Sequence, residues 1–163
     1  MEQVLQAREK ARKHFLIADH MLTQTYPVVN DPKLLLVILE NVFLACTHAM
    51  AALLYYEYYQ KRIPSFQDTF DAKLNMLKLQ VAPRYHIKGE YLSFLSEIKN
   101  LLLAHKRSPV EFVRKDVFVI CSNDYALQTI TLNEMKQYVT KAKVFIQEIT
   151  NIIERRQAPK VVI

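Results

Sequence analysis

LLLVILENVFLACTHAMAALLYY, residues 34–56, is the stretch that decides the fold class. Asp31 and Pro32 precede it as a typical helix start, with Asp31 as the N-cap and Pro32 at the first helical position. No helix breaker follows until about Lys61, which predicts one long helix. Its length would suit a membrane span, but Glu40 inside the bilayer would cost about 2.5–3.5 kcal/mol. The sequence therefore predicts the central helix of a bundle, with no membrane involved.

Four polar residues interrupt this helix and share one of its sides: Glu40, Asn41, Thr47 and His48. Polar groups on a buried helix need hydrogen-bonding partners. One interpretation is a network satisfied within the protein, or a hydrated seam between two subunits. The other is that these residues line a functional cleft, with Glu40 and Asn41 at its border. Both interpretations stay open at this stage.

Apolar residues at intervals of three or four predict four further helices around the central one. Their expected ranges are 2–25, about 65–80, 89–106 and about 131–156. Ser65 to Asp68 resembles a capping box, Pro83 is expected to stop that third helix, and Thr131 and Glu134 form a capping box for the last helix. We expect one all-α, up-and-down domain of five helices over residues 1–157, followed by a loose tail at 158–163.

A small β-element is expected between the last two helices. Residues 117–121 and 126–130 are rich in strand-forming side chains, and the turn-type cluster Ser122-Asn123-Asp124 separates them. This pattern predicts a two-stranded hairpin at about residues 116–130, packed on the bundle.

Composition narrows the function classes. Gly89 is the one glycine in 163 residues, which argues against glycine-rich nucleotide-binding loops. Cys46 and Cys121 lie in unrelated apolar runs, so we expect no zinc site, disulfide or other cofactor. The N-terminus lacks the apolar core of a signal peptide, which predicts a cytoplasmic protein. A net charge of +6 permits an acidic partner such as RNA without requiring one.

The end of the fourth helix, EIKNLLLAHKR at residues 97–107, carries polar residues into an apolar pattern. His105 continues the apolar stripe of this helix, whereas Lys99 lies about 120° away on an ideal helix. Asn100 falls on the more polar side. These three groups cannot converge within one straight helix, so a joint site needs a distorted helix end, a second helix or a second subunit.

Lys99-Asn100, followed by four residues and His105, resembles the motif of the HEPN superfamily, in which an arginine precedes a histidine by a similar spacing. The likeness extends over the five-helix bundle. The stretch from Ser108 to Ser122 also looks like a segment of archaeal HEPN-like proteins. The departure is the lysine, which presents a point charge where the family has a planar, bidentate guanidinium.

The resemblance implies a homodimer formed through the second and fourth helices and a metal-independent endoribonuclease site. His105 would act as general acid or base, Lys99 would hold the phosphate and Asn100 would orient one of them. Further positive potential would come from four basic residues: Lys106, Arg107, Arg114 and Lys115. The alternative is a non-catalytic binding or regulatory dimer with a degenerate motif. Family members often pair with a nucleotidyltransferase in toxin–antitoxin systems, but no residue here indicates that partner.

Overall fold

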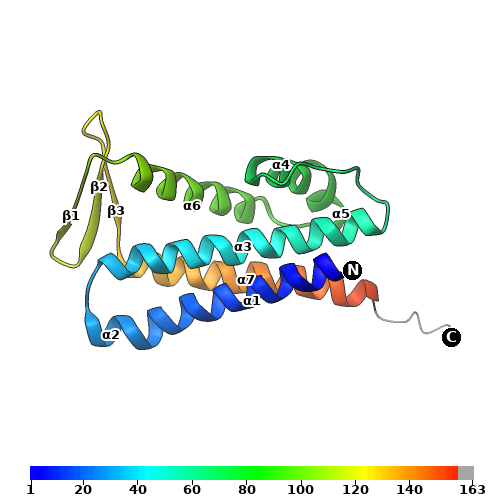
Figure 1. Ribbon diagram of the computed structural model, residues 1–163, viewed down its shortest axis with the longest axis horizontal. Coiled ribbons are helices and arrows are strands. Elements are labelled where there is room, and N and C mark those ends of the chain that lie inside the picture. Colours follow the sequence, from blue (N-terminus) through cyan, green and yellow to red (C-terminus); the bar gives the residue numbers. More distant parts are fainter. Residues whose placement is uncertain (158–163) are drawn as a thin grey trace.

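The computed structural model describes residues 1–157, and the expected tail from 158 onward lies outside that range. Within it, five helical segments and a small sheet form the fold (Figure 1). The helices and strands are α1 (Glu2–His20), α2 (Tyr26–Val29), α3 (Lys33–Tyr59), α4 (Phe70–Met76), α5 (Ala82–Tyr85), α6 (Gly89–Arg107), β1 (Val110–Arg114), β2 (Val117–Cys121), β3 (Leu127–Ile130) and α7 (Leu132–Gln157). Two of the segments carry two labels each, because a π-helical turn joins α1 to α2 and another joins α4 to α5.

The helix α3 is the centre of the bundle, as the sequence predicts. In Figure 1, α1 and α7 run along one side of it and α6 along the other. Its residues Leu35, Ile38 and Leu53 are fully buried and share one core with all the other long helices. The helix begins at Lys33 with Pro32 as its N-cap, one residue later than predicted. Asp31 still accepts a hydrogen bond from the backbone N–H of Lys33 at 3.0 Å.

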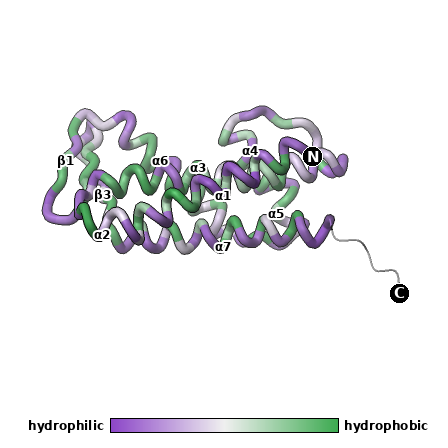
Figure 2. Tube along the Cα trace, turned by 60° about the horizontal axis from the view of Figure 1, so that its bottom comes forward, coloured by the Kyte–Doolittle hydropathy of each residue, from purple (hydrophilic) through white to green (hydrophobic). Residues whose placement is uncertain are grey.

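α3 is also long and apolar enough to cross a membrane by length and composition. Half of its most apolar window is buried against the other helices, which is how the core helix of a bundle passes the same test. Figure 2 shows hydrophobic and hydrophilic residues alternating along α7, as expected for a helix with one buried face.

Pro83 was expected to end a helix and does not do so, and the first helix continues past its expected end at residue 25. Pro83 lies in the first turn of α5, which continues from α4 through the π-helical turn Leu77–Val81. Pro27 occupies the same place in α2, after the π-helical turn Met21–Thr25. Because a proline lacks the N–H that an α-helix uses and crowds the preceding turn, the wider π turn gives it room. The first helical segment therefore reaches Val29.

The start of the third helix also differs from the prediction. Ser65 lies outside the helix, which begins at Phe70, and Thr69 is its N-cap. The hydroxyl of Thr69 accepts a hydrogen bond from the backbone N–H of Ala72 at 3.2 Å. Thr131 is confirmed as the cap of the last helix, because its hydroxyl accepts a hydrogen bond from the backbone N–H of Glu134 at 3.2 Å, which is one of the two bonds of the expected capping box.

The β-element is a three-stranded antiparallel sheet in the order β1-β2-β3, not a two-stranded hairpin. The predicted hairpin corresponds to β2 and β3, and β1 was missed. Phe118 and Ile120 of β2 are buried in the core of the bundle. Their partners on β1 are Val113 and Glu111, and directly opposed residues of an antiparallel pair share a face. The register therefore turns Glu111 toward the helices.

Candidate functional site

His105 lies in the last turn of α6, beside the sheet. Its Nδ1 is 2.5 Å from Oε1 of Glu111, which β1 directs toward the bundle. The histidine side chain is 28% exposed, so it is half-buried and not part of the buried stripe that the periodicity predicted. The reason is that the end of α6 extends past the central core toward the sheet, where its residues from Leu101 onward are only partly covered.

The carboxylate of Glu111 determines which nitrogen of His105 is available for chemistry. A carboxylate at Nδ1 favours the tautomer that carries its proton there. Nε2 then keeps its lone pair and can accept a proton from a substrate. The contact has the geometry that a general base and its positioning carboxylate require.

Lys99 lies toward the other end of the same helical surface. Its Nζ is 2.6 Å from Oδ1 of Asp71 and 4.7 Å from the centre of the Phe70 ring. Both partners come from α4, so the short helix holds the ammonium group in place. Asp71 is 76% exposed, which makes this a surface ion pair that an incoming anion can displace.

Lys99 and His105 line one groove of about 420 Å³ between α3 and α6. Leu102 lies between them on α6, and Glu40 and Leu44 of α3 form part of the opposite wall. Lys106, Leu103, Phe43 and Phe70 complete the lining. Lys99 and His105 lie about 120° apart around α6, with an apolar strip between them. Because α3 packs over this strip, both side chains reach the same groove. We call it the α3–α6 groove.

Asn100 is separate from this groove. It lines another surface hollow, of about 850 Å³, together with Ser96, Glu97 and Gln128. The three residues of the motif therefore do not form one constellation within a subunit. Only Lys99 and His105 come together.

The polar strip of α3 is divided in the same way. Glu40 is exposed in the α3–α6 groove, which fits the cleft interpretation. Asn41 and His48 face α1 instead: Oδ1 of Asn41 is 3.1 Å from Nδ1 of His14, and the His14 and His48 rings stack at 5.6 Å. Thr47 has a buried hydroxyl without a hydrogen-bonding partner among the described residues. Asn41 and His48 therefore fit the internal network, whereas Thr47 fits neither interpretation.

Protonation of His48 is expected to destabilise the fold. Partial burial lowers the pKa of His48 below its ordinary value of 6.5, and the charges of His14, Lys10 and Lys73 lower it further. The nearby Asp68 opposes this effect. The unfolded chain then binds the proton more readily, so stability is lost as the pH falls below about 6.5.

Thermal unfolding should show this effect. Between about pH 7.5 and pH 5, the melting temperature of the wild type should fall more than that of His48→Gln, because glutamine does not titrate. His20→Gln, an exposed histidine of α1, is the matched control and should behave like the wild type. Parallel curves for all three proteins would contradict the assignment.

The four predicted basic residues fall into two pairs. Lys106 and Arg107 are exposed at the end of α6, beside the groove. Arg114 and Lys115 are exposed at the far end of β1, which runs away from α6 for about 15 Å. Figure 1 shows the β1–β2 turn at the opposite end of the sheet from the last turn of α6. Only the first pair adjoins Lys99 and His105.

Glu111 and Asp71, which contact the two motif residues, were not predicted. The sequence VEFVR of β1 held a usable indication: a carboxylate on the strand face opposite Ile120 points inward and needs a partner. Nothing local marks Asp71, because its contact with Lys99 joins residues 28 positions apart.

Metal-binding groups and cysteines were also compared with the expectation from the sequence. No group of three or more His, Cys, Asp or Glu side chains in that range could hold a metal ion. Cys46 and Cys121 are both free thiols, and burial raises the pKa of the Cys46 thiol.

Comparison of the chain with protein-family models, with curated proteins and with solved structures found no match.

Proposed function

We propose that this chain is a HEPN-like protein that binds single-stranded RNA in the α3–α6 groove and cleaves it without a metal ion. One observation carries the proposal: the groove holds the cation Lys99 and a histidine whose Nδ1 is engaged by Glu111. A phosphate-binding cation and a positioned general base are two of the groups that cleavage by an internal ribose hydroxyl uses.

In the proposed reaction, Nε2 of His105 takes the proton of a ribose 2′-hydroxyl. The 2′-oxygen then bonds to the adjacent phosphorus, and the bond from phosphorus to the 5′-oxygen breaks. That 5′-oxygen leaves with a proton from Nε2 of the second His105 of the proposed homodimer, which acts in its protonated, imidazolium form beside its own Glu111. The products are a 2′,3′-cyclic phosphate and a free 5′-hydroxyl. Lys99 offsets the negative charge that develops on the phosphate, and Lys106 adds to the attraction.

A homodimer is part of this proposal. Val37 and Leu44 on α3 are exposed large apolar side chains, and Leu102 and Leu103 on α6 are only half-buried. These side chains lie on the two helices that frame the groove, and a second copy packed there would cover them. The same contact would bring two His105 side chains to one seam.

The alternative is a dimer that binds RNA without cleaving it. The ion pair between Lys99 and Asp71 weighs against cleavage, because a carboxylate already occupies the cation that would hold the scissile phosphate. Lysine also lacks the bidentate fork with which an arginine could hold the phosphate in one orientation.

Cleavage of a labelled single-stranded RNA in excess EDTA separates the two functions. The proposed enzyme releases fragments with a cyclic phosphate end, whereas the alternative shifts the RNA in a binding assay and leaves it intact. Binding in either case should weaken steeply with salt, since phosphate contacts release counterions. If the RNA neither binds at low salt nor is cleaved, both functions are wrong.

Releasing Lys99 from Asp71 should strengthen RNA binding. Asp71→Asn removes the competing carboxylate, and an exposed ion pair of this kind is worth about 0.2–1 kcal/mol, or roughly 1.5- to 5-fold in affinity. Fluorescence anisotropy of a labelled oligonucleotide measures it.

Asp68→Asn is the matched control. Asp68 is equally exposed in the same segment and pairs with Lys73 at 2.5 Å, outside the residues that line the groove. An equal gain in both variants would reflect net charge alone and would remove Lys99 from the binding site.

A further inference from the structure

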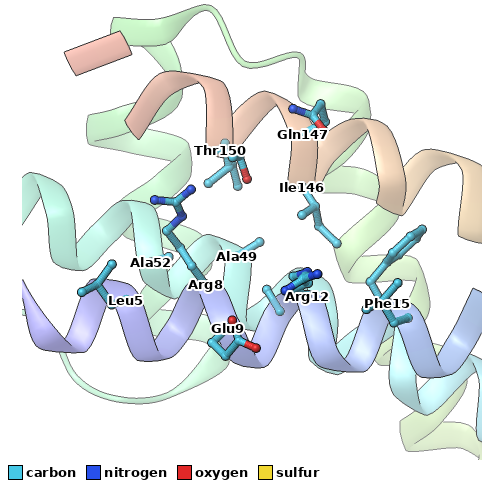
Figure 3. A pocket seen from close by; sticks show the side chains of 13 residues that line it. Leu5, Arg8, Glu9, Arg12, Phe15, Ala49, Ala52, Ile146, Gln147 and Thr150 are labelled. Atoms are coloured by element: carbon cyan, nitrogen blue, oxygen red, sulfur yellow. The ribbon is translucent and has the colours of Figure 1, made fainter. Parts of the chain in front are cut away.

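A second pocket lies on the side of the bundle away from the α3–α6 groove, where α1, α3 and α7 meet. Its volume is about 370 Å³, within the range of small-molecule sites of about 300–1,000 Å³. Figure 3 shows α1 along one wall and α7 along the other, with Ala49 and Ala52 of α3 at its base. Because both base residues are alanines, α1 and α7 leave a space between them that larger side chains would fill.

Apolar and polar side chains occur at both ends of this pocket. Phe15, Ile146 and Gln147 lie at one end (Figure 3). Leu5, Arg8 and Thr150 lie toward the other. Arg12 projects between them from α1. An apolar chamber with a few polar groups is the usual make-up of a site for a small organic molecule.

The charged groups specify the polar end of the occupant. Arg8 is paired with Glu154 at 2.7 Å, whereas Arg12 makes no ion pair with any described residue. Glu9 is the only carboxylate among the described lining residues, and it does not pair with Arg12. A guanidinium next to an apolar chamber favours a ligand that joins a carboxylate to a hydrocarbon chain.

We propose that this pocket binds a medium-chain carboxylate, with its head on Arg12 and its chain toward Phe15 and Ile146. Octanoate is a suitable probe, since its hydrocarbon chain fits a pocket of this volume. With so few non-hydrogen atoms, its dissociation constant should be on the order of a millimolar. The site is independent of the proposed RNA chemistry, because it shares no residue with the α3–α6 groove.

The experiment is a methyl NMR titration of the full chain with octanoate, following Ile146 and Leu5. Saturable shifts of these methyl groups are expected for the wild type. Octylamine has the same chain with a positive head, and it should bind at least about tenfold more weakly, since one charge-assisted contact is worth roughly that factor. Equal binding of octanoate and octylamine would overturn the proposal.

Two variants with the same change of charge complete the test. Arg12→Gln should weaken octanoate binding about tenfold, while Lys13→Gln, the next position on α1 and outside this pocket, should leave it within about twofold. Equal losses would show only a general effect of charge and would overturn the site. Methyl shifts that appear on concentrating the protein without octanoate would assign this face to a second copy of the chain instead.

Discussion

Replacing His105 with alanine is expected to lower the rate of metal-independent RNA cleavage by about 10²–10⁴-fold, the usual contribution of a general acid or base. The proposed reaction depends on Nε2 of this residue, and the half-buried position of His105 leaves the ring accessible from the groove. The measurement is the rate of appearance of cyclic-phosphate fragments from a labelled RNA in excess EDTA.

The control for this prediction is His20→Ala, which removes an exposed histidine of α1 remote from the groove. Equal rates in the wild type, His105→Ala and His20→Ala would identify the activity as a contaminant. Glu111→Gln adds a finer test: it keeps the size of the side chain but removes the charge that stabilises an imidazolium. It should slow cleavage while RNA affinity stays near that of the wild type. A loss of affinity without a loss of rate would place Glu111 in RNA binding.

The second large effect concerns stability. Glu57, near the end of α3, is fully buried and accepts contacts from Arg62 at 2.8 Å, from Arg84 and from the hydroxyl of Tyr85. Removing one partner of a buried ion pair costs about 3–5 kcal/mol, because the remaining charges lose their counterion. Arg62 and Arg84 are 28% and 33% exposed, so water relieves part of that cost. We therefore expect Glu57→Ala to destabilise the fold by about 3 kcal/mol.

Thermal unfolding measures this as a fall of about 6–12 °C in the melting temperature, since a chain of this size loses roughly 2–4 °C per kcal/mol. Glu90→Ala, which removes an exposed carboxylate from the first turn of α6, should change it by no more than about 2 °C. A fall of less than that for Glu57→Ala would mean that Glu57 contributes no net stability.

The sequence alone determined the helices, because burial imposes a periodic pattern that local reading detects. The apolar run of residues 34–56 specified the central helix, and the spacing of apolar residues located the other four. The errors lie at helix ends: the third helix begins at Phe70 and not at Ser65, Pro83 does not stop it, and the first helix runs on past residue 25 through Pro27. A π turn before each proline absorbs the missing hydrogen bond, and no local pattern distinguishes that solution from a helix end.

Strand β1 was missed for a related reason. Four of its five residues are exposed, so the strand is held by its pairing with β2 and not by burial in the core. Burial is what produces the pattern that a sequence reveals. Without β1, the sequence could not place Glu111 beside His105, and that contact depends on the register of a sheet that follows the helix.

The candidate site shows the same division between sequence and tertiary structure. Spacing along α6 correctly placed Lys99 and His105 apart on the helix, and it singled out both residues. Only packing could decide that α3 and α4 close a groove over the strip between them, which leaves Asn100 outside and brings in Asp71. The physical reason is range: periodicity follows from neighbours within two turns, whereas a groove, an ion pair and an exposed histidine depend on which distant elements pack together.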